Sequence, residues 1–294
     1  MRTLDRSPAV HRTVVSDRRE PVPGIAVLGL IAPRLAEMTL PGQFAMAIPP
    51  GGGQAATALG IYEAEGTRIS LMLVIVGPRT HELAALPTGA SLDLIGPLGN
   101  GFELDSLGEN VALIAGGVGI ASLLLPAQSL ASRGKRLTLL YGARTADALV
   151  DVNRFSELGA KVACATDDGT RGHSGFVTDL LRALPKHAFS GIAACGPSPM
   201  LRAVGRAAAY LEIPAQLALE ETFACGVGAC WGCVVPHAAS SVGAPIGLIG
   251  APPQAAPRPP HAKRVGPPTR EIADFSYVRV CKEGPVFWAH ELRW

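Results

Sequence analysis

Short apolar runs separated by turn residues fill the first third of the chain. The runs cover residues 25–31, 44–48, 69–76 and 91–95, and breaks such as Pro41-Gly42 lie between them. Short strands at this spacing are typical of an antiparallel β-barrel. We therefore predict a barrel over residues 1–106, with the first ten residues frayed. The glycines of residues 96–102 would let the backbone approach a flat ligand closely.

From residue 107 the pattern changes to strands that alternate with helices. We expect strands at residues 111–115, 136–141, 161–166 and 191–195, and helices after residue 119, over 176–184 and from 198. This alternation predicts a doubly wound parallel sheet over residues 107–212. Ligands of such sheets bind at the carboxyl ends of the strands.

Three groups of residues typical of ligand sites fall at those strand ends. They are the G-G-x-G turn (Gly116, Gly117 and Gly119), Asp167-Asp168, and Cys195-Gly196-Pro197. A glycine turn that opens a helix points N–H groups at a phosphate. Its spacing departs from the G-x-G-x-x-G fingerprint, so the turn alone also fits a strand–helix connection without a ligand. The coincidence of all three groups predicts a nucleotide site.

Three cysteines lie within nine residues in the last part of the chain. Cys225, Cys230 and Cys233 have the C-x4-C-x2-C spacing of plant-type [2Fe–2S] proteins. Cys281 is the only cysteine downstream and is the candidate fourth ligand. A zinc site or a disulfide is the alternative. The chain has a single C-x2-C pair and no visible secretory signal, which disfavours both.

A segment rich in alanine and proline separates Cys233 from Cys281. We expect residues 238–268 to be a flexible or polyproline-like insertion within a small cluster domain at 213–294. Its length does not prevent Cys281 from returning to the other cysteines. Each doubling of a loop adds only about 0.6 kcal/mol to the free energy of closure.

Composition excludes two classes of partner. The net charge is +2 and no basic stripe with interleaved aromatic residues is visible, so nucleic-acid binding is not expected. The most apolar run, residues 111–126, is too short to span a bilayer. We expect a soluble, cytoplasmic protein with no membrane partner.

The arrangement resembles the ferredoxin reductase-like family, and most closely the electron transfer subunits of NAD-dependent (type B) dihydroorotate dehydrogenases. The matching residues span nearly the whole chain: 41–44, 96–102, 116–119, 166–169, 175–179, 195–197, 220–233 and 281–287. The resemblance implies FAD between the barrel and the nucleotide domain, with NAD(H) at the glycine turn. It also implies a [2Fe–2S] cluster held by Cys225, Cys230, Cys233 and Cys281.

The resemblance further implies an oxidoreductase subunit that depends on NADH. Electrons would pass from NADH through FAD and the cluster to a partner subunit that contains FMN. That partner would oxidise dihydroorotate in pyrimidine biosynthesis, within a hetero-oligomer expected to be a heterotetramer. Because the cofactors carry this chemistry, we expect no acid–base catalytic residue in the chain.

The flavin contacts implied by the resemblance lie on three barrel segments. They are Thr57, Ala58, Leu59 and Gly60; Val74, Ile75 and Val76; and Arg79 and Thr80. The family motif Arg-Pro-Ile-Ser should stand at residues 57–60, and its arginine is missing here. Arginine–phosphate contacts are strong and geometrically specific. We therefore expect weak FAD binding, a substitute cation such as Arg79, or a changed flavin.

Several residues have two interpretations. Asp167 and Asp168 either contact ribose or cap a turn, and Cys195 either lies over the nicotinamide or is simply buried. Glu220 and Glu221 either include a contact to the flavin edge or form a solvated strand end.

Two alternative functions stay open. The same module would serve another redox partner, such as a hydrogenase or a sulfide or glutamate-type reductase. The missing arginine at residues 57–60 also leaves open a [2Fe–2S] sensor or structural protein without flavin.

Overall fold

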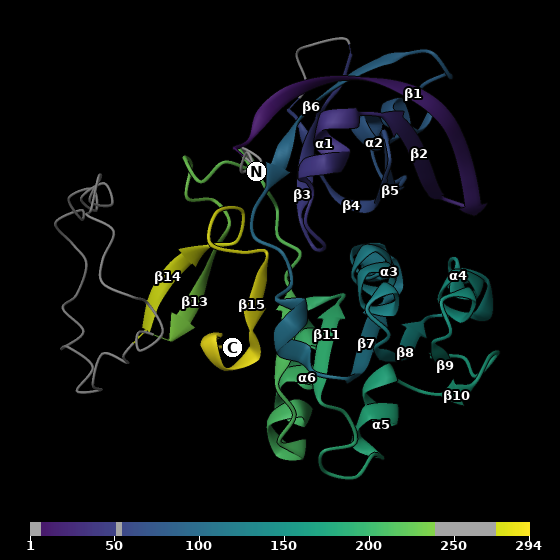
Figure 1. The fold of residues 1–294 in the computed structure, drawn as a ribbon, viewed down its shortest axis with the longest axis vertical. Coiled ribbons are helices and arrows are strands. Elements are labelled where there is room, and N and C mark those ends of the chain that lie inside the picture. The colour runs from purple at the N-terminus through teal and green to yellow at the C-terminus, as the bar shows by residue number, and fades with distance from the viewer. Residues whose placement is uncertain (1–6, 51–54, 239–274) are drawn as a thin grey trace, which may run out of the picture.

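The computed structural model describes residues 7–50, 55–238 and 275–294. Figure 1 shows the barrel at the top, the parallel sheet with its helices below it, and the C-terminal strands beside both. Among the described helices, none is long and apolar enough to cross a membrane.

Six antiparallel strands close the barrel in the order β1-β2-β5-β4-β3-β6. The strands are β1 (Ala9–Val22), β2 (Ile25–Ile31), β3 (Phe44–Ile48), β4 (Thr57–Glu65), β5 (Arg68–Val74) and β6 (Ser91–Leu98), and the barrel also carries α1 (Pro33–Met38) and α2 (Pro78–Ala84). The four apolar runs in the sequence correspond to β2, β3, β5 and β6. The predicted antiparallel barrel is therefore confirmed.

Strand β1 begins at Ala9, inside the segment expected to be frayed. Its sequence is polar because only alternate side chains face the barrel core. Thr13 and Val15 are buried, whereas Arg12 and Val14 between and beside them are exposed. Pairing with both β2 and β6 satisfies the backbone groups of this strand.

The second sheet has the order β10-β9-β8-β7-β11-β12-β15. Its strands are β7 (Asn110–Gly116), β8 (Arg136–Ala143), β9 (Lys161–Thr166), β10 (His173–Ser174), β11 (Gly191–Cys195), β12 (Ala215–Ala218) and β15 (Val286–Trp288). All neighbours are parallel except β12 and β15. Strand order reverses between β7 and β11, and ligands of such sheets bind at this switch point.

Helices cover both faces of this sheet, which confirms the doubly wound prediction. The helices are α3 (Leu124–Ser132), α4 (Val152–Glu157), α5 (Val177–Arg182) and α6 (Ser198–Leu211), with 3-10 turns η1 (Leu104–Leu107), η2 (Gly117–Ser122), η3 (Ala146–Ala148) and η5 (Ala289–Glu291). One core contains apolar residues of α3 and α4, and the other contains those of α5 and α6. Consecutive residues of β7, such as Leu113 and Ile114, belong to opposite cores.

The C-terminal strands tie the cysteine segment to this sheet. Strand β13 (Val234–Ala238) pairs with β14 (Phe275–Arg279), and β15 then joins β12 antiparallel. Strands on both sides of the predicted limit at residue 212 thus share one sheet. The domain limits at 106 and 212 stay a prediction, and the proposed insertion 238–268 lies outside the described residues beyond Ala238.

Two glycines of residues 96–102, Gly99 and Gly101, pack closely against other parts of the chain. A Cβ on Gly99 would lie 2.5 Å from Cδ of Pro285 and 2.6 Å from the carbonyl oxygen of Gly284. A Cβ on Gly101 would lie 2.6 Å from the carbonyl oxygen of Pro41. The expected close approach is present, but at these two positions its partner is the chain itself.

Two glycines give opposite stability predictions. A Cβ on Gly119 would lie 2.5 Å from the carbonyl carbon of Cys195, so Gly119→Ala should destabilise the fold by about 1–3 kcal/mol. Gly205, inside α6, offers a Cβ only ordinary contacts at 3.6 Å. Gly205→Ala should therefore stabilise it by about 0.5–1 kcal/mol. Calorimetric melting measures both, and a neutral Gly119→Ala would contradict the close packing at the switch point.

Candidate functional site

A cavity of about 680 Å³ opens at the carboxyl ends of the central strands. It is lined by Gly116, Gly117, Gly142, Ala143, Arg144, Asp167, Gly175, Phe176, Val177, Thr178, Arg182, Pro197, Pro199, Met200 and Ala203. This volume lies within the range of about 300–1,000 Å³ that is usual for sites of small ligands. The cavity holds the predicted Gly116, Gly117 and Pro197 at the sheet's switch point.

Two predicted glycines, Gly119 and Gly196, lie behind that cavity and do not line it. Their backbones pack closely where β7 and β11 meet. Gly117 has φ +52 and open space around its Cβ position, so it faces the cavity. The turn enters a 3-10 segment, η2, and the α-helix expected there begins only at Leu124.

The two aspartates have different environments. Asp167 lines the cavity. Asp168 accepts hydrogen bonds from the backbone N–H and hydroxyl of Thr170 at 3.0 and 2.6 Å, and thus caps its own turn. Of the two interpretations, a ligand contact fits Asp167 and a turn cap fits Asp168.

Three of the lining residues that were not predicted as ligand contacts carry a charge or an aromatic ring. Arg144 and Arg182 bring positive charge to the cavity, and Phe176 presents a ring that is 67% exposed. Arg144 follows directly on β8, so its place at a strand end was a usable signal. Phe176 lies in the segment 175–179 that carries the family resemblance, but the sequence assigned its ring no role.

A second cavity, of about 260 Å³, lies where the barrel, the parallel sheet and the cysteine segment meet. It is lined by Gly42, Phe44, Ala58, Leu59, Gly60, Met72, Val74, Val118, Ala121, Ser122, Cys195, Ala218, Leu219, Glu220, Glu221, Phe223 and Pro285. Its volume is below that of whole-ligand sites, so it would hold one ring system of a larger cofactor. Four predicted flavin contacts and Cys195 line it.

A thiol–carboxyl pair closes one wall of this second cavity. Cys195 donates from Sγ to Oε1 of Glu220 at 3.6 Å. Burial, followed by the nearby Glu220 charge, raises the pKa of Cys195 above its usual range. Burial also raises the pKa of Glu220, although the hydrogen bond from the Cys195 thiol opposes this rise. Glu220 itself lines the cavity. Cys195 therefore stays protonated at neutral pH and is a hydrogen-bond donor.

The other predicted flavin residues lie outside the second cavity. They are Thr57, Ile75, Val76, Arg79 and Thr80. The Thr80 hydroxyl accepts hydrogen bonds from the N–H groups of Val76 and Gly77 at 3.0 and 3.1 Å, so it caps the start of α2. Val76 is 80% exposed.

Two features near the missing arginine suit a phosphate-bearing cofactor. The Oγ1 atom of Thr57 is buried and has no hydrogen-bond partner in the described structure. Arg79 is exposed and donates to the carbonyl oxygen of Ala55 at 3.3 Å, two residues before Thr57 in the sequence. An exposed cation and a hydroxyl without a partner on this part of the barrel fit a ligand that carries negative charge.

The four cysteines of the predicted cluster form two pairs. The N–H of Cys230 donates to Sγ of Cys225 at 3.4 Å, and the N–H of Cys281 donates to Sγ of Cys233 at 3.4 Å. Burial acts to raise the pKa of Cys225. Hydrogen bonds from the backbone N–H groups of Cys230 and Val227 together outweigh this effect and lower the pKa to about 6. Burial, followed by the Cys233 thiol, raises the pKa of Cys281 to about 12.

The donor set of this site, four cysteine thiols in two pairs, suits a two-iron centre. All six cysteines are free thiols. Two pairs of thiols match a [2Fe–2S] cluster, which takes four cysteines over two irons, whereas zinc needs four ligands around one point.

The cysteine pairs are joined to the second cavity by main-chain contacts. The carbonyl of Gly284 accepts from the N–H of Asn100 at 2.6 Å, and the carbonyl of Pro285 accepts from the N–H of Leu219 at 2.9 Å. The side chain of Asn100 adds bonds to Glu283 and Val286. Pro285 lines the cavity four residues after Cys281, so cavity and thiols are held together.

Comparisons with known proteins support this arrangement. Residues 267–293 match the family model described as the iron-sulfur cluster binding domain of dihydroorotate dehydrogenase B. The electron transfer subunit of dihydroorotate dehydrogenase B (NAD(+)) of Caldanaerobacter subterraneus subsp. tengcongensis is 31% identical over 270 residues. The match covers 89% of this chain and 94% of that protein. A probable subunit of the same kind from Thermococcus kodakarensis is 37% identical over 197 residues, covering 66% and 78%.

Solved structures show the same fold. An NADH-dependent reduced ferredoxin–NADP oxidoreductase, known from work on flavin-based electron bifurcation, superposes with a TM-score of 0.76 at 25% identity. That match covers 96% of this chain and 90% of the other. A ferredoxin NADP+ reductase from Neisseria gonorrhoeae, solved with FAD and NADP, has a TM-score of 0.59 at 15% identity, covering 69% and 91%.

The expectation of a [2Fe–2S] cluster, FAD and NAD(H) is confirmed at the level of this family. The relatives match over most of their own length, and the iron–sulfur domain lies at the predicted C-terminal end. The chain belongs to the family of electron transfer subunits of dihydroorotate dehydrogenase B.

Proposed function

We propose that this subunit takes the two electrons released when an FMN-containing catalytic subunit oxidises dihydroorotate in pyrimidine biosynthesis, and delivers them to NAD+. This direction is the reverse of the one expected from the sequence, because a subunit that oxidises dihydroorotate gives up electrons and cannot also accept them from NADH. The two subunits would form a hetero-oligomer. The observation that carries the proposal is the serial arrangement of the sites. Pro197 lines the first cavity and Cys195, two residues earlier, lines the second; Pro285 joins the second to Cys281.

The residues of the first cavity would bind the nicotinamide nucleotide. Backbone at Gly117 is open to the cavity, and Arg144 and Arg182 would offset phosphate charge. Phe176 would present its exposed ring to a base, and Asp167 its carboxylate to ribose hydroxyls.

The residues of the second cavity would hold the flavin ring and keep water from it. Ala58, Leu59 and Val74 supply an apolar wall, and the protonated Cys195, which donates its S–H to Glu220, adds an uncharged sulfur to the lining. Arg79 would bind the cofactor's phosphates in place of the missing arginine. When bound, FAD and the cluster supply the conversion of two-electron into one-electron transfer.

The cysteine loop would face the partner subunit. Cys230 is exposed, and three large side chains of the cysteine loop and of β14 are exposed as well: Val227, Trp231 and Tyr277 are 46%, 50% and 56% exposed. The Arg279 guanidinium lies 4.7 Å from the centre of the Trp231 ring and fixes it. Exposed aromatic residues and arginine are enriched in the cores of protein interfaces.

A direct test co-expresses the chain with a dihydroorotate dehydrogenase catalytic subunit. The purified complex should reduce NAD+ when dihydroorotate is added, and the catalytic subunit alone should not. A complex that fails with dihydroorotate but transfers electrons from NADH to another redox partner would support the same module with a different client. The TM-score of 0.76 to an oxidoreductase that uses ferredoxin makes that the second candidate.

Substitution at the glycine turn tests the nucleotide site. Gly117→Ala adds a methyl group to the cavity wall and strains a residue at φ +52, so the KM for NADH should rise several-fold. Gly134→Ala is the control, because Gly134 has φ +72, equally open space and no place in the cavity. Steady-state kinetics that show equal KM values in the two variants would contradict the assignment.

Cys230→Ser tests the order of transfer. Loss of one ligand should remove iron and sulfide and abolish electron transfer from the partner to NAD+, while NADH-dependent dye reduction at the flavin continues. The control is Cys164→Ser, since Cys164 lies in β9 away from both thiol pairs. Dye reduction that disappears together with transfer from the partner would show that the order is wrong.

Arg79→Ala tests whether a substitute cation retains FAD. A lost charge-assisted contact of about 1.5–3 kcal/mol should weaken FAD binding about ten-fold or more in a fluorescence titration. Arg34→Ala, at an exposed arginine on α1 of the same barrel, should leave the FAD affinity unchanged. Wild-type protein that contains the cluster and binds no FAD would instead support the flavin-less alternative.

A further inference from the structure

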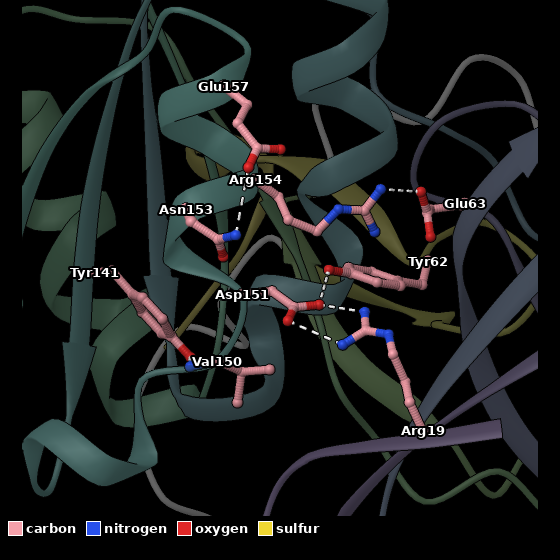
Figure 2. A network of polar contacts seen from close by, with 9 residues as sticks. All are labelled: Arg19, Tyr62, Glu63, Tyr141, Val150, Asp151, Asn153, Arg154 and Glu157. Carbon is pink, nitrogen blue, oxygen red and sulfur yellow. Dashed lines mark hydrogen bonds and ion pairs between the residues drawn. The ribbon is translucent and has the colours of Figure 1, made fainter.

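A polar network joins the barrel to the parallel-sheet domain near Asp151 (Figure 2). Asp151 stands at the start of α4 and accepts two hydrogen bonds from Arg19 of β1, one of them at 3.0 Å from Nη1 to Oδ1. The hydroxyl of Tyr62, on β4, donates to Oδ2 of Asp151 at 2.6 Å. One carboxylate thus binds two barrel strands.

A second ion pair stands beside the first. Arg154, on α4, pairs with Glu63 of β4, and its guanidinium carbon lies 5.5 Å from the centre of the Tyr62 ring. With Asp151 and Arg19, the group contains two positive and two negative charges around one tyrosine (Figure 2). The charges balance, and each charged side chain has a partner from the opposite domain.

The backbone of Asp151 is held in an unusual conformation. Its φ is 50°, in the left-handed region that residues other than glycine rarely adopt. Aspartate is a favoured helix N-cap, yet this side chain makes no cap hydrogen bond to α4. Such a conformation persists only where the surroundings impose it. The side chain is turned to the barrel at the expense of its own helix.

The network continues to the glycine turn of the first cavity. The N–H of Val150, next to Asp151, donates to the hydroxyl oxygen of Tyr141 at 3.2 Å. The Tyr141 hydroxyl in turn donates to the carbonyl oxygen of Gly117 at 3.0 Å. Tyr62 lies on the strand that carries Leu59 and Gly60 in the second cavity. A continuous path therefore connects the two cavities.

We propose that Asp151 is a positioning residue, which fixes the barrel against the nucleotide domain and so sets how the nicotinamide meets the flavin ring. The inference rests on the proposed function, because it assigns the two cavities to those two rings. Transfer between bound groups depends steeply on their alignment, and a displacement of about 1 Å can slow it about 100-fold.

The network keeps one charge state through the working pH range. Burial raises the pKa of Tyr62, and the nearby Asp151 adds to the rise. Burial acts to raise the pKa of Asp151 as well, but hydrogen bonds from Arg19 and Tyr62 outweigh it and hold this pKa below its usual value. Tyr62 remains a donor and Asp151 an acceptor, as a permanent support requires.

The test uses the complete protein with its cofactors in two variants, Asp151→Asn and Tyr62→Phe. Flavin reduction by NADH is followed in single turnover as the NADH concentration is raised. The limiting rate should fall about ten-fold or more, while the NADH concentration at half-maximal rate stays as in the wild type. Asp17→Asn is the control, because Asp17 pairs with Arg68 within the barrel at an exposed site.

A second measurement does not depend on activity. Amide hydrogen exchange should be faster in both variants over residues 57–65 and 146–157, and unchanged in Asp17→Asn. Tyr141→Phe should accelerate exchange over residues 146–157 and at the glycine turn, because it breaks the path between them. If Asp151→Asn does not fold, Tyr62→Phe carries the test, since it removes a single hydroxyl.

The outcomes separate the two levels of inference. Wild-type protein whose flavin is not reduced by NADH would overturn the proposed function. Wild-type protein that is reduced, with variants that share its limiting rate, would overturn the positioning role of Asp151, whatever their melting temperatures. Unchanged exchange over residues 57–65 and 146–157 would overturn it as well.

Discussion

The structure depends on the main-chain contacts of residues 281–288, which touch all three parts of the protein. Cys281 pairs with Cys233, the carbonyl of Gly284 accepts from Asn100 in the barrel, and β15 extends the parallel sheet beside β12. Backbone hydrogen bonds between fixed strands leave the joined segments little freedom to move, whereas contacts through long side chains would leave them more. The thiol pairs are therefore held against the second cavity by the fold itself.

Two kinds of contact would serve the two transfers. Between cavity and cysteines the contact is backbone on backbone, reinforced where Gly99 packs on Pro285 without room for a Cβ. Between barrel and nucleotide domain it is a balanced group of charges around Tyr62, with Asp151 bonded to both barrel strands. Close packing suits a joint that is sealed from water. The paired charges lie beside a second packed joint, because Tyr62 and Val27 of the barrel belong to one apolar core with residues of the parallel sheet.

Local patterns predicted the fold well, and contacts between distant residues escaped them. Strands β3 and β9 have the predicted limits because their apolar runs end at clear turn residues. Strand β1 was missed because a barrel strand with one face outside reads as polar. The spacing of the cysteines indicated which thiols are the candidate cluster ligands. Asp151, however, resembles any helix cap in sequence, and its partners Arg19 and Tyr62 are 132 and 89 residues away. Nor does sequence tell whether a glycine such as Gly99 approaches a ligand or another strand.

The central claim is that the four thiols hold a two-iron centre beside the second cavity. Anomalous diffraction at the iron edge, from crystals of the protein with its cofactors, tests it most directly. The account predicts two iron atoms in one cluster, one bound to Cys225 and Cys230 and the other to Cys233 and Cys281. A single zinc atom, or iron bound without Cys281, would contradict it.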